Sequence, residues 1–393
     1  KIKINIMIRL AENTITHEEL LALSEWIPNS PQLTKGPLVI EFEKKFASFT
    51  GTKHCVMVNS GSSANLLMAY SLLEGNYLKN KKVVVPAISW ITTLSPFLQF
   101  GFDVLLCDSN NVNLGLDTQK LEEIFIKEKP ALLILVHVLA HLNDMEEINR
   151  LCEKYDVLLI EDACEALGTS DVNGKKAGNL SLAGSFSFYY GHHISTIEGG
   201  AVTTNDTKLY NLMLSIRSHG WSRDVDSNFK EEWKKEFNID DVREFYTFYY
   251  PGFNLRSTDL NAFIGISQLD KMDEIIKVRE NNYNFYNKFL EGKYWKQESK
   301  FSELSSFAYG TIVENRMEVF NHLKKNNIEV RPLICGSMGK QPFWIKKYGH
   351  TPLEVADVIH DYGLYLPNHL YLDEEKIKFV CDKFKEVAVP KFF

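Results

Sequence analysis

Two adjacent histidines, His192 and His193, lie in the middle of the chain, just after a strand-like run of serine and aromatic residues. A glycine precedes them, and a Gly-Gly pair at residues 199–200 closes the segment. Imidazole titrates near neutral pH, so one histidine can take up a proton in one step and release it in the next. His192 is therefore our first candidate for acid–base chemistry. The alternative is a structural histidine in a tyrosine-rich turn, and the role of His193 is open.

A candidate anion site lies where a strand gives way to a helix through small residues. Residues 56–65 read Val-Met-Val-Asn-Ser-Gly-Ser-Ser-Ala-Asn. Gly61 allows close approach of a ligand to the backbone. Ser62 and Ser63 stand at the helix N-terminus, where free N–H groups and the helix dipole favour an anion. Ser187, five residues before His192, can donate its hydroxyl to the same group. A simple helix-capping turn is the alternative.

Two acids, Asp162 and Glu165, follow a buried strand and are suited to holding an aromatic ligand. A carboxylate bonded to a pyridine nitrogen keeps that nitrogen protonated, so the ring accepts electrons from an adjacent carbanion. Asp162 is the candidate for this place, with a helix N-cap as the alternative. Glu165 would face a ring hydroxyl or serve as a capping partner. Trp90, which follows another strand, would stack on the ring face or merely pack against protein.

The segment around His192 resembles the frame that carries the lysine of pyridoxal-phosphate (PLP) enzymes. In that frame a serine-aromatic strand, a turn and a Gly-Gly pair surround a lysine that binds the cofactor as a Schiff base. His192 occupies the lysine position, and imidazole cannot form this bond. The resemblance implies non-covalent PLP, or its amine form pyridoxamine phosphate (PMP), held by the anion site, Asp162 and a stacked aromatic ring.

Alternating strands and helices must position these candidates. Short, continuous apolar runs predict strands of a sheet that is covered on both faces. The predicted strands are 54–58, 83–86, 103–108, 131–138, 157–161, 184–189 and 200–204. The predicted helices are 62–73, 93–100, 117–128 and 144–155. This order is typical of an α/β fold with a mainly parallel seven-stranded sheet, which binds ligands at the carboxyl ends of its strands.

The last third of the chain predicts a smaller α+β domain. Residues 224–242 are charged and lack periodicity, which indicates a loop or loose helices that could form a lid. Residues 259–290 predict a long helical region, and short elements are predicted at 307–313, 316–326, 328–332 and 374–388. We expect a large PLP-binding domain over 1–265, with its N-terminal segment packed on the small domain. A linking helix and the small domain are expected over 266–393.

Composition excludes several classes of function. The net charge of −7 argues against a nucleic-acid partner, because phosphate binding needs a basic face. Six cysteines are scattered without a CxxC pair, so neither a metal site nor a disulfide framework is expected. No apolar run is long enough to span a membrane, and residues 1–10 are unlike a signal peptide. We expect a soluble, cytoplasmic protein.

Taken together, these stretches resemble the sugar aminotransferase/dehydratase family that includes the DegT, DnrJ, EryC1 and ArnB proteins. The family belongs to PLP fold type I, the aspartate aminotransferase-like fold. Residues 33–43 resemble the family's entry motif, residues 252–256 its later Gly-Tyr-Asn-x-Arg motif, and Arg331-Pro332 the Arg-Pro of the small domain. Each motif is weak alone, but their order and spacing are specific together.

The family resemblance implies roles for individual residues. The implied cofactor-binding residues are Gly61, Ser62, Ser63 and Ser187 at the phosphate, Trp90 on the ring face, Asp162 at the ring nitrogen and Glu165 near the ring hydroxyl. Asn254 would reach the phosphate of a neighbouring subunit, which implies a homodimer with a composite active site. Arg256 is a candidate for binding an amino-acid carboxylate or the substrate. His219, Arg223 and Arg331 are further substrate candidates.

Histidine at position 192 departs from the family's usual lysine and resembles the sugar 3-dehydratases. One kind acts on GDP-4-keto-6-deoxymannose and takes its amino group from L-glutamate. Another kind carries an iron–sulfur cluster, which needs several thiolates after the histidine. No cysteine lies between Cys164 and Cys335, so no iron–sulfur cluster is expected and the GDP-sugar kind is favoured.

The main hypothesis is therefore a PLP/PMP-dependent nucleotide-sugar 3-dehydratase. Imidazole can move the required protons, yet it cannot capture the cofactor and so complete a transamination. One alternative is a nucleotide-sugar aminotransferase that works without a lysine. Another is a non-enzymatic descendant, a regulator or binding protein. The nucleotide and the sugar stereochemistry rest on the resemblance alone.

Overall fold

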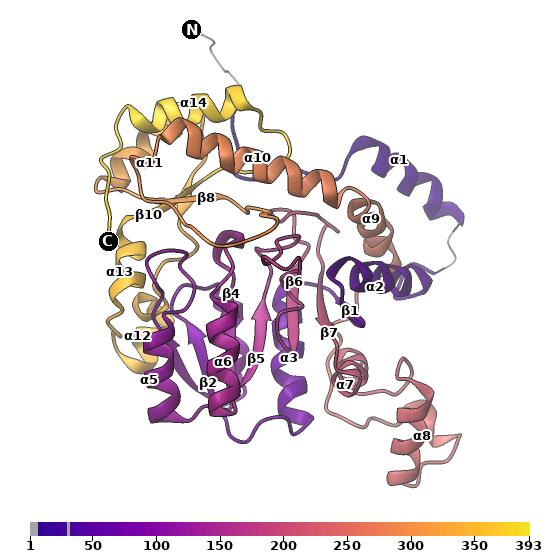
Figure 1. Cartoon of the computed structure of the whole chain (residues 1–393). Coiled ribbons are helices and arrows are strands. Elements are labelled where there is room, and N and C mark those ends of the chain that lie inside the picture. The colour runs from indigo at the N-terminus through magenta and orange to yellow at the C-terminus, as the bar shows by residue number, and fades with distance from the viewer. Residues whose placement is uncertain (1–6, 30–31) are drawn as a thin grey trace.

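The computed structural model describes residues 7–29 and 32–393, and its centre is a sheet of seven strands (Figure 1). In sheet order these are β1 (His54–Val58), β7 (Gly200–Thr204), β6 (Ala183–Ser187), β5 (Leu158–Asp162), β4 (Leu132–Val136), β2 (Lys82–Pro86) and β3 (Asp103–Cys107). β7 is antiparallel to its neighbours β1 and β6, and the other pairings are parallel. The predicted mainly parallel seven-stranded sheet is confirmed.

Helices cover both faces of the sheet, which explains why its strands are continuously apolar. One face carries α3 (Gly61–Glu74), α4 (Ile91–Gln99) and α7 (Thr207–Arg217). The other carries α2 (Pro37–Thr50), α5 (Thr118–Glu128) and α6 (Met145–Tyr155).

The last two residues of β5, Glu161 and Asp162, point to different faces of the sheet. Ile160 packs among the side chains of the α3 face, and Leu159 packs among those of the α6 face. Successive side chains of a strand point in opposite directions. Asp162 therefore points toward α3, whereas Glu161 points toward the other face.

A three-stranded antiparallel sheet organises the smaller α+β part of the chain. Its strands, in order, are β8 (Tyr309–Ile312), β10 (Gly363–Leu366) and β9 (Arg331–Pro332). Its helices are α10 (Met272–Leu290), α11 (Arg316–Lys325), α12 (Pro342–Tyr348), α13 (Glu354–Tyr362) and α14 (Glu374–Lys385). Figure 1 shows α10, α11 and α14 beyond the ends at which the parallel strands stop. Ser337 pairs with Ile88, just after β2, so the small part borders the expected ligand edge.

In the last third, one predicted helical region is divided and some short elements were missed, whereas the charged stretch holds a helix, as one predicted alternative allowed. The helical region 259–290 is two helices, α9 (Asp259–Leu269) and α10, which are separated at residues 270–271. α12, α13 and β10 have seven, nine and four residues, too few for a clear periodic pattern, and were not predicted. The charged stretch 224–242 contains α8 (Ser227–Glu236), which projects away from the main sheet (Figure 1).

The N-terminal part adds α1 (His17–Trp26) and contacts the segment before β9. Ile8 pairs with Ile328, as expected for an N-terminal segment that packs on the small domain. The domain division at residues 265 and 266 stays a prediction. Across residues 7–29 and 32–393, no helix has the length and apolarity needed to cross a bilayer. The expectation about a signal peptide concerns residues 1–10, of which 1–6 lie outside the described residues.

Candidate active site

The start of α3 forms the expected cradle for an anion. Ser60 caps the helix by accepting the Ser63 amide at 3.0 Å, so the capping turn proposed as the alternative is also present. The amides of Gly61 and Ser62 have no acceptor within the described ranges, which leaves both N–H groups available at the positive end of the helix. The serine hydroxyls are used internally: Ser62 donates to Thr92 at 3.0 Å and Ser63 to Asn59 at 2.5 Å.

Gly61 lies directly against Ser187, so the start of α3 and the end of β6 together form this cradle. A Cβ atom on Gly61 would stand 2.6 Å from Ser187 Cβ and 3.1 Å from Cys164 Sγ. Real Cβ atoms do not approach so closely, so only glycine fits between these neighbours. The structure therefore brings Gly61, Ser62, Ser63 and Ser187 together at one edge of the sheet.

Asp162 ends β5 on the same side and is held in one orientation. Its Oδ2 accepts from Asn65 Nδ2 at 2.8 Å and from Thr93 Oγ1 at 2.7 Å. Its Oδ1 accepts the Cys164 amide at 3.2 Å. No helix follows at residues 163–169, so the helix N-cap alternative is wrong. The carboxylate is 5% exposed and retains acceptor capacity on Oδ1.

His192 is tied to the same short segment through its ring. Its Nδ1 lies 2.9 Å from the carbonyl oxygen of Cys164. A carbonyl only accepts, so Nδ1 carries the hydrogen and Nε2 keeps its lone pair. The ring of Phe307, from the small part of the chain, packs at 5.3 Å from the imidazole. Burial lowers the pKa of His192 to about 4, so the ring is neutral at pH 7 and Nε2 can act as a base.

The lowered pKa of His192 predicts a pH effect on the cofactor-free protein. A histidine whose folded-state pKa is about 4, against 6.5 unfolded, loses stabilisation as pH falls through this interval. The unfolding free energy should decrease between pH 7 and pH 4.5 in the wild-type protein. We expect this decrease to be about 1–2 kcal/mol smaller in His192→Gln, a value that allows for partial exposure of the ring. Urea denaturation at both pH values measures this fall. An equal fall in the two proteins would contradict the prediction.

Glu165 and Trp90 complete the predicted set around Asp162. Glu165 Oε2 accepts the Leu139 amide at 2.8 Å, and burial raises the pKa of the carboxyl to about 8. At pH 7 this group is mostly protonated, so it can also donate to a ligand oxygen. Trp90 precedes α4 and is 57% exposed, so core packing is wrong and a ring face is open for stacking.

Four further candidates form a separate polar cluster beside Trp221. Arg256 donates to Asn254 Oδ1 at 3.0 Å and lies 3.3 Å from His219 Nε2. Arg223 stacks over the Trp221 ring at 4.1 Å. The amide of Asn59 bonds to the Leu255 carbonyl, which places this segment next to the anion cradle. Among the described residues, no hydrogen bond joins the cluster to His192 or Asp162.

Arg331 and His193 lie apart from these groups. Arg331 stands on β9, is exposed and donates to Glu329 at 2.9 Å. His193 is fully buried, and its Nε2 lies 2.8 Å from the Ser305 carbonyl oxygen. This bond anchors the turn to the small part of the chain and occupies His193 Nε2, and the His193 ring packs at 5.8 Å from Phe307. Within the described residues, no three His, Cys, Asp or Glu side chains gather as a metal site requires.

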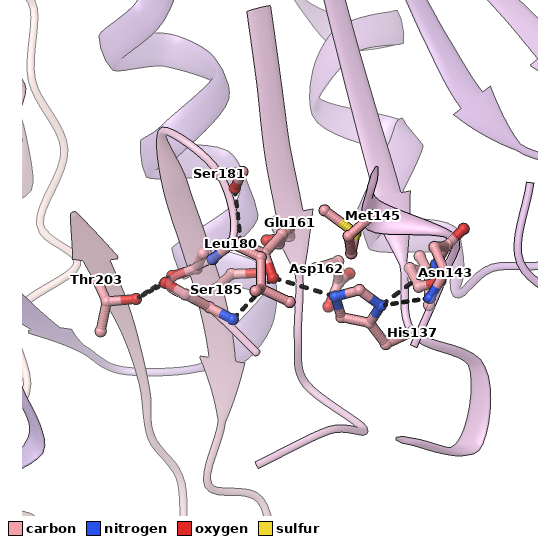
Figure 2. Close-up of polar contacts among 12 residues, drawn as sticks. His137, Asn143, Met145, Glu161, Asp162, Leu180, Ser181, Ser185 and Thr203 are labelled. Atoms are coloured by element: carbon pink, nitrogen blue, oxygen red, sulfur yellow. Dashed lines mark hydrogen bonds and ion pairs between the residues drawn. The ribbon is translucent and has the colours of Figure 1, made fainter. Parts of the chain in front are cut away.

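Sequence reasoning missed a buried network behind Asp162. Figure 2 shows Glu161, on the opposite face of β5, bonded to His137 and to the loop that precedes β6. Glu161 Oε2 accepts from His137 at 3.1 Å and from the Gly178 amide at 2.8 Å. Its Oε1 accepts from the Leu180 amide and the Ser181 hydroxyl, each at 2.8 Å. Four donors therefore satisfy this buried carboxylate and fix the end of β5.

The site as a whole fits PLP or PMP. Free amides at a helix N-terminus suit its phosphate, and the open Oδ1 position of Asp162 suits its protonated ring nitrogen. Glu165 and the exposed face of Trp90 suit the ring hydroxyl and the ring face. His192 stands where a covalent lysine would be expected, so these contacts alone would hold the cofactor.

Comparison with known proteins leads to the same family. The model of the DegT/DnrJ/EryC1/StrS aminotransferase family matches residues 14–385. GDP-4-keto-6-deoxy-D-mannose 3-dehydratase of Yersinia pseudotuberculosis is 35% identical over 388 residues, covering 96% of this chain and 98% of that protein. GDP-4-keto-6-deoxy-D-mannose-3-dehydratase of E. coli with bound hydrated PLP has a similar structure, with a TM-score of 0.87 at 31% identity, covering 96% and 100% of the two chains.

A further solved structure is that of GDP-4-keto-6-deoxymannose-3-dehydratase with a trapped PLP-glutamate geminal diamine. It matches with a TM-score of 0.87 at 30% identity and covers 96% of this chain and 100% of its own. These similarities confirm the predicted PLP-dependent, aspartate aminotransferase-like fold. The chain belongs to the DegT/DnrJ/EryC1/StrS aminotransferase family.

Proposed function

We propose that this protein is a PLP/PMP-dependent 3-dehydratase that converts GDP-4-keto-6-deoxymannose to GDP-4-keto-3,6-dideoxymannose, with L-glutamate as amino donor. The observation that carries the proposal is His192, which stands in the lysine position with Nδ1 bonded to the Cys164 carbonyl and Nε2 free. The names of similar proteins support the same substrate and donor. The enzyme would act in the cytoplasm.

The site residues divide the work between proton transfer and binding. PMP supplies an amine that joins the sugar at its keto carbon and a ring that draws electrons from the adjacent bonds. His192 Nε2 takes the proton from the carbon attached to the ring and then returns a proton to the hydroxyl that leaves sugar C3. Asp162 holds the ring nitrogen, and the amides at the start of α3 hold the phosphate.

Histidine in place of lysine determines the fate of the amino group. A lysine could reclaim the cofactor covalently and release the sugar as a stable amine. Imidazole cannot capture the cofactor in this way, so the amino group leaves as ammonia when water hydrolyses the deoxygenated product. Glutamate then restores the amine of the cofactor and becomes 2-oxoglutarate. Each turnover therefore yields one deoxy sugar, one ammonia and one 2-oxoglutarate.

The decisive assay supplies GDP-4-keto-6-deoxymannose, PLP and glutamate to the purified protein. Ammonia and a 3-deoxy ketone in equal amounts are expected. A stable amino sugar without ammonia would instead identify a nucleotide-sugar aminotransferase. PLP binding without turnover of GDP-, CDP-, UDP- or dTDP-linked 4-keto-6-deoxy sugars would favour a non-enzymatic role.

We further propose a homodimer in which the cluster around Asn254 serves the neighbouring active site. Large apolar side chains are exposed on α1 and after α8, including Leu20, Leu21, Val242 and Phe245. Exposed apolar patches of this kind commonly mark subunit contacts. Arg223, Arg256 and Arg331 would supply positive charge for the anionic substrate and for glutamate, and His219 would lie beside Arg256 as a further polar contact.

A mixing experiment tests the composite site. His192→Asn and Asn254→Ala proteins are each expected to be inactive, because each lacks a group that every site needs. Unfolding and refolding them together should recover about a quarter of wild-type activity, since half of the subunits pair with the other type and each such pair holds one intact site. Light scattering verifies the dimer. No recovery from a verified mixed dimer would contradict shared sites.

A further inference from the structure

Three buried side chains outside the predicted set converge on Asp162. Asn65 and Thr93 both donate to its Oδ2, at 2.8 Å and 2.7 Å. Ser185 in turn donates to Asn65 Oδ1 at 2.7 Å. Asn65 is 3% exposed, and Thr93 and Ser185 are fully buried. They come from α3, α4 and β6: α3 and α4 each supply a donor to the carboxylate, and β6 supports it through Asn65.

The acceptor-only carboxylate of Asp162 determines which way the Asn65 amide faces. A carboxylate has no hydrogen to give, so the Asn65 atom next to Asp162 must be the NH₂ group. Asn65 Oδ1 then points to Ser185, whose hydroxyl supplies the matching donor. The reverse orientation would press Asn65 Oδ1 against the carboxylate and would leave Asp162 Oδ2 with Thr93 as its one donor. Ser185 and Asn65 thus form a chain with a fixed direction that ends on Asp162.

The donors leave Asp162 open on one side only. Oδ2 accepts two hydrogen bonds and is saturated. Oδ1 accepts the Cys164 amide at 3.2 Å and keeps a second lone pair, and the Cys164 thiol, a weak donor, also lies against this carboxylate. Without Asn65 and Thr93 the carboxylate could rotate and present either oxygen. With both in place, the remaining lone pair has one defined direction.

We propose that Asn65, Thr93 and Ser185 are positioning residues that aim Oδ1 of Asp162 at the ring nitrogen of the cofactor and so set how firmly that nitrogen holds its proton. The proposal rests on PLP binding, which is part of the proposed function, but not on the identity of the sugar. A buried donor lost from one side of a carboxylate changes both its orientation and its strength as an acceptor. The electron demand of the ring would therefore depend on side chains that do not touch it.

The test measures the cofactor itself, without sugar. PLP labelled with ¹⁵N at the ring is titrated into each variant, and two quantities are recorded: the dissociation constant and the pH at which the bound ring nitrogen loses its proton. Thr93→Val keeps the shape of the side chain but removes the donor. We expect about tenfold weaker PLP binding and loss of the proton at a pH lower by about one unit. Thr93→Ser keeps the hydroxyl and should restore both values.

Thr203→Val provides a matched control for loss of a buried threonine hydroxyl. Thr203 is fully buried and donates to the Gly178 carbonyl at 2.7 Å, in the network of Figure 2 and away from Asp162. Its variant should leave the ring nitrogen unchanged. Ser185→Ala removes only the donor to Asn65, at the far end of the hydrogen-bond chain from Asp162. It should shift both quantities in the same direction as Thr93→Val but by a smaller amount. It also tests the proposal if Thr93→Val fails to fold.

The outcomes separate this proposal from the proposed function. If Ser185→Ala and Thr93→Val bind PLP as wild type does and keep its ring-nitrogen titration, or if Thr93→Ser behaves as Thr93→Val does, the positioning role is overturned. The same shifts in Thr203→Val would also overturn it. If the shifts occur as expected and no sugar releases ammonia, the positioning role stands and the dehydratase assignment fails.

Discussion

Replacing His192 with asparagine is expected to lower the rate of sugar deoxygenation by at least about a thousandfold while PLP still binds. The asparagine amide can donate to a carbonyl, but it has no basic lone pair with which to take a proton. The cofactor contacts at Asp162 and at the start of α3 do not involve the ring of His192. Ammonia release measures the rate, and absorbance of bound PLP measures the cofactor.

His193→Asn is the matched comparison, because it makes the same change at the adjacent histidine, to which no chemical role is assigned. His193 is fully buried and bonds to Ser305, so its replacement should lower stability while leaving the chemistry of the folded enzyme largely intact. If His192→Asn kept more than a tenth of wild-type activity, a different group would have to move the proton. If folded His193→Asn lost activity and His192→Asn kept it, the base would be His193 and the assignment to His192 would be wrong.

The second large effect is expected on stability, from Glu161→Gln. The Glu161 and His137 side chains are both fully buried, and four donors point at the carboxylate. Glutamine keeps one acceptor oxygen and turns an NH₂ group toward two of these donors. His137 cannot reverse its tautomer freely, because its Nδ1 accepts the Asn143 amide at 3.3 Å. We expect a loss of about 3 kcal/mol in unfolding free energy, measured by urea denaturation of the cofactor-free protein.

Glu147→Gln is the control for removing a carboxylate charge. Glu147 forms a surface pair with Arg150 at 2.6 Å on α6. Exposed pairs contribute little, so a change within about 0.5 kcal/mol is expected. Equal losses in the two variants would mean that the buried network contributes no more than a surface ion pair.

The strands were predicted well because their signal is local. β1 and β7 were predicted with their observed ends, and β2, β3 and β5 lie within one residue of prediction at each end. Covered strands in a parallel sheet are continuously apolar, and this pattern requires no knowledge of distant contacts. The short elements near residues 342–366 gave no such pattern, because their positions depend on packing against the large sheet.

The same distinction applies to the site. Gly61, Asp162 and His192 lie in local motifs at strand and helix ends, so their residue types and spacing suggested their chemistry. The contribution of Phe307 had no local signal, since it reaches His192 from more than a hundred residues away in the chain. Asn65 could have been suspected as a polar residue on a buried helix, but its partner Asp162 becomes visible only in the folded chain.

The main chain of Cys164 connects two functional groups of the site. Its amide donates to Asp162 and its carbonyl accepts from His192. The backbone of one residue therefore links the carboxylate that would hold the cofactor ring to the histidine that would act as the base. Both attachments use main-chain atoms, whereas the side chain of Cys164 packs against Gly61. Exchange of the residue at position 192 would then leave the tether of Asp162 untouched. A scaffold built in this way keeps its hold on the ring while the residue that moves the proton changes.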